Sequence, residues 1–141
     1  MNSLKKLLLL NITERKMLFE AVITLFWVKI LVVLSPLRWY ATILGKERAL
    51  TPEDLYANEI IFEIARAIVR GRKVFPWKTL CLCEAVTAKI MLNRRQIVST
   101  LYLGVAKEKG TLIAHAWLRC GTTYVTGKRG MERFTVVSTF A

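Results

Sequence analysis

Residues 79–105 read TLCLCEAVTAKIMLNRRQIVSTLYLGV, and the pattern of this stretch changes half-way along it. Apolar residues first recur at helical spacing, which predicts a helix from about Lys78 to Asn93. Residues 98–106 then alternate between the two faces expected of a strand. A helix that carries Cys81 and Cys83 at its start therefore leads into a sheet, and this transition decides the fold.

The predicted sheet continues towards the C-terminus. EKG at 108–110 predicts a turn, and residues 111–120, TLIAHAWLRC, alternate again, so that His115, the single histidine, shares a face with Trp117. Two more short strands are predicted in TTYVTG and RFTVVSTFA, residues 122–127 and 133–141. We therefore expect a small antiparallel sheet.

Helices are predicted for the N-terminal half of the chain. The run TERKMLFEAVITLFWVKILVVL, residues 13–34, begins with Thr13 as a capping residue, and a shorter helix is expected at 36–45. The clearest helical pattern is that of residues 51–71, which has an apolar stripe at helical spacing and ends at Gly71. Helices that come first and an antiparallel sheet that follows indicate an α+β fold.

Composition narrows the class of protein. The chain has 141 residues, the size of one domain, and 54 % of them are apolar, which suits a packed core and excludes wholesale disorder. Three cysteines without a signal-peptide pattern indicate a reducing cytoplasm rather than a disulfide framework. The net charge of +12 attracts anions such as nucleic acid, acidic lipid and acidic peptide. The charge alone does not indicate which of these the protein binds.

The apolar run near the N-terminus raises the question of a membrane span. Such a helix needs about 20 predominantly apolar residues. Glu20 and Lys29 interrupt this run, and a charge at the centre of a span costs roughly 2.5–3.5 kcal/mol. We therefore expect residues 17–34 to be buried in the domain, to lie on a membrane surface or to be covered by a partner, rather than to cross a bilayer.

Cys81 and His115 are candidates for a nucleophile and its base. The first turn of a helix has unpaired amide N–H groups and a positive dipole end, and with Lys78 nearby it favours the thiolate of Cys81. His115 lies on a predicted strand and forms a workable dyad with Cys81 if that strand packs over the start of the helix.

Two other interpretations of these residues stay open. Buried cysteines commonly serve as small hydrophobic residues of the core. Cys81, Cys83, His115 and Cys120 also supply the four nitrogen and sulfur ligands of a tetrahedral zinc site, although Cys-x-Cys is tighter than the usual ligand spacing.

From about Pro76 to Ala141 the sequence resembles the lasso-peptide leader peptidases of the transglutaminase-like cysteine protease superfamily. The shared pattern consists of Cys-Leu-x-x-Ala on a helix, paired basic residues near the end of that helix, a Leu-x-x-Gly-Val strand and an Ala-His-Ala-Trp strand. SPLRWYATILG in the N-terminal half is similar more loosely. The resemblance implies a transglutaminase- or papain-like core, with Cys81 as nucleophile, His115 as base and Cys83 at a variable position.

The third catalytic member departs from the family pattern. The family commonly has an Asp on the strand after the histidine strand, and that position falls at or next to Gly127 here. Glu132 is the only acid downstream of His115, so it is the candidate that orients the imidazole. A backbone carbonyl or Thr126 is the alternative, because loss of the orienting acid need not abolish a dyad.

The resemblance also implies an organisation and a set of partners. We expect residues 1–50 to form a helical segment that contacts a partner or a membrane, and residues 51–141 to form the peptidase core. The enzyme takes the leader region of a lasso-peptide precursor as substrate and needs no cofactor or metal. It works in the cytoplasm with a separate leader-binding protein, beside an asparagine-synthetase-like cyclase, with membrane contact through residues 17–34 as a further expectation.

Other functional classes predict different behaviour. A nucleic-acid binder would use VRGRKVF, Arg94-Arg95 and GKRGMERF against phosphates, but few aromatic residues accompany them and no base-reading motif is visible. A non-enzymatic assembly protein would have a Cys81 that resists thiol alkylation.

Overall fold

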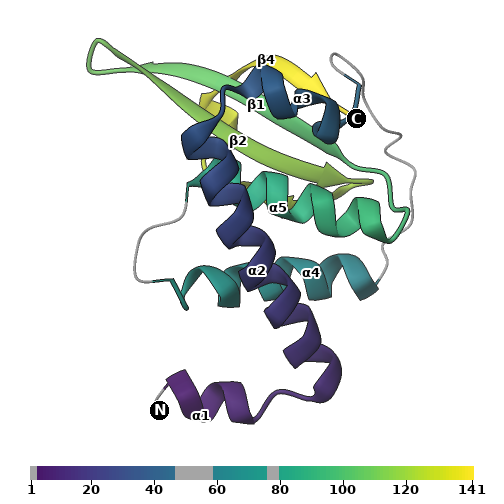
Figure 1. Ribbon diagram of the computed structural model, residues 1–141. Coiled ribbons are helices and arrows are strands. Elements are labelled where there is room, and N and C mark those ends of the chain that lie inside the picture. Colours follow the sequence, from purple (N-terminus) through teal and green to yellow (C-terminus); the bar gives the residue numbers. More distant parts are fainter. Residues whose placement is uncertain (1–2, 47–58, 76–79) are drawn as a thin grey trace.

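The computed structural model describes residues 3–46, 59–75 and 80–141 (Figure 1). Within these ranges the chain forms helices, followed by a four-stranded antiparallel sheet in the order β3-β2-β1-β4. The predicted α+β fold is confirmed. The elements are α1 (Ser3–Leu8), α2 (Ile12–Leu34), α3 (Leu37–Leu44), α4 (Glu59–Arg72), α5 (Cys81–Arg94), β1 (Thr100–Glu108), β2 (Thr111–Cys120), β3 (Thr123–Thr126), the 3-10 helix η1 (Met131–Arg133) and β4 (Thr135–Phe140).

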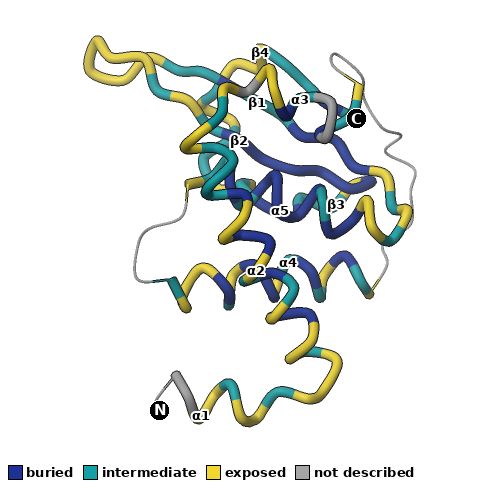
Figure 2. Tube along the Cα trace, viewed as in Figure 1, coloured by how far each residue is buried: buried dark blue, intermediate teal, exposed yellow. Residues whose placement is uncertain are grey.

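Helix α5 lies at the centre of the molecule. It packs on β2, β3 and β1 on one side and on α2 and α4 on the other (Figure 1). Most of α5 is buried accordingly, whereas the tip of the β1–β2 hairpin is exposed (Figure 2). This position of α5 against the sheet brings its first turn, which begins at Cys81, beside β2 and β3.

Helix α2 shares the core with the C-terminal part of the chain. Ala21 and Val28 of α2 belong to the same hydrophobic cluster as Ile64 of α4, Met91 of α5 and Leu101 of β1. The family-based division of the chain at residue 50 stays a prediction.

Two helix boundaries differ from those predicted. Asn11, rather than Thr13, caps α2: its side chain accepts from the Glu14 N–H at 2.8 Å, and the Glu14 carboxylate accepts from the Asn11 N–H at 3.0 Å. Gly71 lies inside the last turn of α4 instead of ending it, since the helix continues to Arg72. A Cβ on Gly71 would come within 3.3 Å of Leu25 Cδ1, so the glycine lets α2 approach closely. The expected starts of the helices at 51 and 78 lie outside the described residues.

Arginines of α5 neutralise the acid that interrupts the apolar run of α2. Glu20 pairs with Arg95 at 2.6 Å and with Arg94 at 3.1 Å. The hydrogen bond from Arg95 holds the pKa of Glu20 below its usual value, against the opposing effect of burial. Because both arginines are paired with Glu20, the Arg94-Arg95 pair is a weak candidate for contacts with nucleic-acid phosphates.

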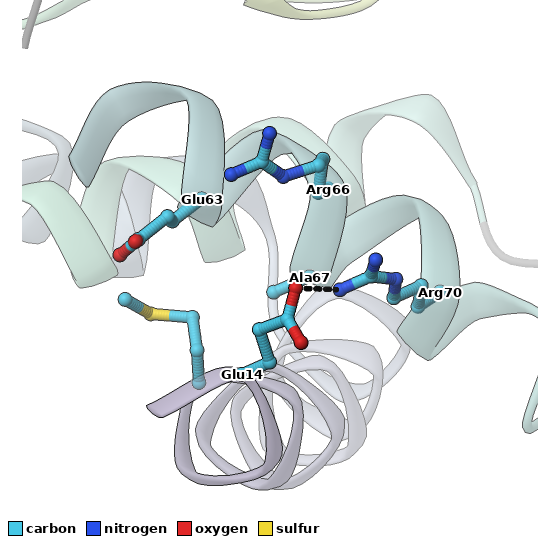
Figure 3. Close-up of a pocket in the computed structure, with 6 residues that line it drawn as sticks. Glu14, Glu63, Arg66, Ala67 and Arg70 are labelled. Carbon is cyan, nitrogen blue, oxygen red and sulfur yellow. Dashed lines mark ion pairs between the residues drawn. The ribbon is translucent and has the colours of Figure 1, made fainter. Parts of the chain in front are cut away.

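A small depression between α2 and α4 is lined by charged side chains (Figure 3). Glu14 Oε1 lies 3.6 Å from the Arg70 guanidinium, and Glu63 and Arg66 lie beside this pair. The depression has a volume of about 10 Å³, which is room for about one water molecule. The ion pair therefore links α2 to α4, and the depression offers no space for a larger ligand.

Candidate active site

A cleft of about 710 Å³ opens where the start of α5, helix α4 and strands β2 and β3 meet. Cys81 of α5 and His115 of β2 both line it, and both are partly buried. Within the described parts of the chain no hydrogen bond joins the two side chains, and such contacts are often loose before substrate binds. The structure thus brings the predicted nucleophile and base to one concave site.

The start of α5 leaves backbone donors beside Cys81. Cys81 is the first residue of the helix, and the preceding Leu80 has no side-chain oxygen that accepts a capping hydrogen bond. The first intrahelical bond runs from the Glu84 N–H to the Leu80 carbonyl at 3.1 Å. The earlier amides of this turn have no intrahelical acceptor, so they are suited to stabilise negative charge at the sulfur or on a bound carbonyl oxygen.

A backbone carbonyl orients the imidazole of His115. Its Nε2 lies 2.7 Å from the carbonyl oxygen of Gly127, at the end of β3. A carbonyl oxygen only accepts hydrogen bonds, so Nε2 carries the proton. In the neutral ring Nδ1 is then the unprotonated nitrogen and is the one that can accept a proton.

The conformation of Gly127 explains why the expected acid is replaced here. Gly127 has a φ of +71°, and a Cβ at this position would lie 2.5 Å from the Ala116 carbonyl oxygen and 2.7 Å from Trp117 Cβ. The backbone is therefore pressed against β2, which brings its carbonyl to His115. An aspartate at this position would have to displace that backbone, since the left-handed conformation and the close approach both favour glycine.

Aromatic residues hold the other faces of the His115 ring. The Trp117 ring lies 5.6 Å from it at an interplanar angle of 27°, and the Phe134 ring lies 5.0 Å away. Gly104 of β1 pairs with His115 in the ladder, and a Cβ on it would come within 2.8 Å of the Trp117 ring and 2.9 Å of Phe134 Cβ. The glycine of the Leu-x-x-Gly-Val strand thus makes room for the two aromatic side chains.

The other two candidates for orienting His115 make no hydrogen bond to it in the described structure. Glu132 is exposed on η1 and makes no hydrogen bond to His115 in the described structure. Thr126 lines the cleft and is buried, and its hydroxyl has no hydrogen-bond partner among the described residues. From the sequence, a backbone carbonyl was only one of the alternatives for orienting His115. The feature that pointed to it was the glycine at or next to the position where the family commonly has its acid.

The remaining cysteines belong to the core. Cys83 has no exposed surface and Cys120 has 2 %, and burial raises the pKa of both thiols. The Cys120 thiol donates to the Val98 carbonyl at 3.3 Å. Among the described residues no three His, Cys, Asp or Glu side chains are grouped to hold a metal ion, so Cys81, Cys83, His115 and Cys120 do not form the zinc site considered from the sequence.

Cations predominate along the cleft. Arg72, Lys128 and Arg129 line it, and Glu84 is the single acid among its described lining residues. Glu84 lies 3.7 Å from Arg72, which leaves Lys128 and Arg129, both exposed, beside the carbonyl that orients His115. The rim of the cleft is therefore positively charged next to the candidate dyad.

Comparison with known protein families gives one match. A family model described as the transglutaminase-like superfamily matches residues 24–139, from the middle of α2 to the end of β4. The matched range contains Cys81, His115 and Gly127. No curated protein and no solved structure matches the chain significantly.

Proposed function

Because the chain belongs to the transglutaminase-like superfamily, we propose that it is a cysteine peptidase in which Cys81 is the nucleophile and His115 the base. One observation carries this proposal: Cys81, at the start of a helix, and His115, hydrogen-bonded so that Nδ1 is the proton acceptor, line the same cleft. The superfamily supports a fold of the cysteine-protease type, and the peptidase activity is the step proposed here.

The cleft offers each group that amide hydrolysis needs. The Cys81 thiolate attacks the carbonyl carbon of the scissile bond, and the amides of the first turn of α5 stabilise the oxyanion. Protonated His115 gives its Nδ1 proton to the leaving amine, which leaves with the C-terminal product. Water then attacks the thioester, His115 takes the proton of that water, and the Cys81–carbonyl bond breaks to release the carboxylic acid.

The Gly127 carbonyl takes the place of the orienting acid in this mechanism. It fixes the tautomer and the plane of the ring, but it is neutral and stabilises the imidazolium less than a carboxylate would. Glu132 is the other candidate for this role, and substitution of Glu132 by Gln separates the two.

We further propose that the substrate is the leader region of a lasso-peptide precursor. The order of the motifs from Cys81 to the Ala-His-Ala-Trp strand supports this choice. The positive rim of Lys128 and Arg129 suits a precursor with acidic residues near the cleavage site. A separate leader-binding protein presents the precursor, and an asparagine-synthetase-like cyclase uses the released core peptide in the cytoplasm.

Mass spectrometry of a cleavage reaction tests the proposal. The purified chain is incubated with the precursor and the leader-binding protein, in parallel with Cys81→Ala and with the matched variant Cys83→Ala. We expect free leader and core with the wild type and with Cys83→Ala, and intact precursor with Cys81→Ala. Cleavage by a folded Cys81→Ala variant would overturn the mechanism.

A further inference from the structure

Helix α2 has apolar residues on its exposed side as well as on the side that packs in the core. Its inner side packs in the core through residues such as Ala21, Leu25 and Val28. The described part of the chain contains one helix, Ile12–Leu34, that is long and apolar enough to cross a membrane, and a third of its most apolar window is buried. Its other side, called here the outer face of α2, consists of exposed apolar residues: Phe19, Ile23, Phe26, Trp27, Val33 and Leu34.

The outer face is extensively exposed. Phe19 is 68 % exposed, Trp27 63 % and Leu34 74 %. Next to it, an open apolar groove of about 440 Å³ runs between α2 and α5 and is lined by residues that include Leu31 and Ile90. A soluble helix normally turns polar residues to water, so an apolar stripe of this kind indicates a surface that is covered in use.

The charges around the outer face are cationic. The acids of α2 are Glu14 and Glu20. Glu14 pairs with Arg70 of α4, and Glu20 pairs with Arg94 and Arg95 at the C-terminal end of α5. Lys16 on the same helix is exposed, and further exposed cations lie on the neighbouring helices, namely Lys5, Lys6 and Arg38. The apolar stripe is therefore flanked along the chain by exposed cations, while the acids of α2 are paired with arginines.

We propose that the outer face of α2 binds the surface of an anionic lipid bilayer, with the helix lying in the plane of the membrane. Exposed Trp and Phe flanked by Lys and Arg are typical of helices that bind at the bilayer interface. The outer-face side chains carry no hydrogen-bonding group except the Trp27 indole, whereas protein interfaces usually contain about one hydrogen bond per 100–200 Å².

A transmembrane orientation does not fit the packing of α2. Crossing a bilayer would remove Ala21 and Leu25 from their contacts with the core. It would also take Glu20 away from Arg94 and Arg95 and leave a charge inside the hydrocarbon. A helix that lies on the membrane surface, by contrast, keeps both its inner packing and its ion pairs.

Vesicle flotation of the purified full chain tests the proposal. The chain is mixed with vesicles of phosphatidylcholine alone and with vesicles that also contain phosphatidylglycerol. We expect flotation with the anionic vesicles, weakened by added salt, and little with the neutral ones. Lys16→Gln should weaken binding by about fivefold, because one cation near an anionic surface contributes about that much. The exposed Lys107, on the β1–β2 hairpin, provides the matched control Lys107→Gln.

A double substitution tests the apolar part of the interaction. Phe19→Gln with Trp27→Gln should lower vesicle binding at least about tenfold, since it removes two large apolar side chains from the contact. Leu112→Gln with Val137→Gln, at residues that are 68 % and 60 % exposed on the sheet, should bind as the wild type does. Circular dichroism establishes that each variant is folded, and cleavage of precursor in solution by the Phe19 and Trp27 variant should be unchanged.

Three results would overturn the proposal. One is that the wild type does not float with anionic vesicles. Another is that the folded Phe19 and Trp27 variant binds them as well as the wild type. A third is that this variant loses self-association, or loses binding of the leader-binding protein, while the wild type binds neither kind of vesicle; the outer face would then be covered by protein. None of these results bears on whether Cys81 cleaves a precursor, so the two proposals fail independently.

Discussion

The side of α5 that faces the cleft and the side that is buried in the core differ in what their side chains can do. Cys81 and Cys83 are two residues apart, which places them about 200° apart around the helix axis. Cys81 lines the cleft, whereas Cys83 has no exposed surface. Helix geometry alone thus assigns one sulfur to the site and the other to the core.

The basic side chains at the cleft and in the core also differ in their surroundings. His115 at the cleft is partly buried and is hydrogen-bonded on one nitrogen by Gly127. Lys89, on the buried side of α5, is 2 % exposed and donates to the Ser99 carbonyl at 2.7 Å and to the Ser99 hydroxyl at 3.2 Å. Burial lowers the pKa of Lys89 to about 8. A titratable group in the core therefore affects stability, while one in the cleft is available for chemistry.

Alkylation should reveal the largest difference between the two regions. Iodoacetamide at neutral pH should modify Cys81 at least about 100-fold faster than Cys83 or Cys120, because the buried thiols react only after local opening. Peptide mapping by mass spectrometry measures the three rates. All three cysteines should react in denaturant, which serves as the control. Similar rates in the folded protein would remove the distinction between the cysteine at the cleft and those in the core.

The substitution Gly127→Ala should disturb the cleft and leave the buried side of α5 unchanged. The added Cβ meets the Ala116 carbonyl at 2.5 Å, so the backbone that orients His115 has to move. We expect precursor cleavage to fall about 10- to 100-fold, the size of effect typical of a mispositioned general base. The matched variant is Gly110→Ala, which has a similar φ of +79° but no atom within 4 Å of its Cβ. Equal losses in both variants would mean that backbone strain, rather than contact with β2, is responsible.

Lys89→Met should change the pH dependence of stability. The pKa of Lys89 is about 8 in the folded chain and 10.5 in the reference state, so between these values the unfolded chain binds more protons and stability rises with pH. Below about pH 8 the folded protein bears the full cost of the buried charge, on the order of 3 kcal/mol.

Chemical denaturation between pH 8 and pH 10 measures this effect. The free energy of unfolding of Lys89→Met should rise less steeply with pH than that of the wild type, and the difference between the two removes the contributions of other titrating groups. Lys107→Met, at an exposed position, is the control. Parallel curves for the wild type and Lys89→Met would show that the amine stays charged in the core.

Glu132→Gln should have the smallest effect. Its side chain is exposed on η1, and in the described structure no hydrogen bond connects it to His115. We expect the cleavage rate to change less than about twofold, as for a surface substitution away from the site. A loss of about tenfold or more would make Glu132 the orienting residue and reduce the importance of the Gly127 carbonyl.

Local patterns predicted the elements of the site better than their contacts. The helix that begins near Cys81 and the strand that carries His115 were recognisable because apolar spacing reports which face of an element is buried. The cap at Asn11 was missed, because neighbouring Thr13 also has a side chain that caps helices. Nothing in the local pattern indicated that the amine of Lys89 is buried with Ser99.

The residues alone indicated the α+β order and the cationic character of the chain. They also indicated a cysteine and a histidine as candidates for catalysis. These properties follow from composition and from periodicities that extend over only a few residues. That Gly127, rather than a carboxylate, meets His115 became evident only from the packed chain. The same is true of the acids of α2, which pair with arginines from other parts of the chain while its outer face stays exposed. Such outcomes depend on how residues far apart in the sequence approach one another, and no local pattern encodes those distances.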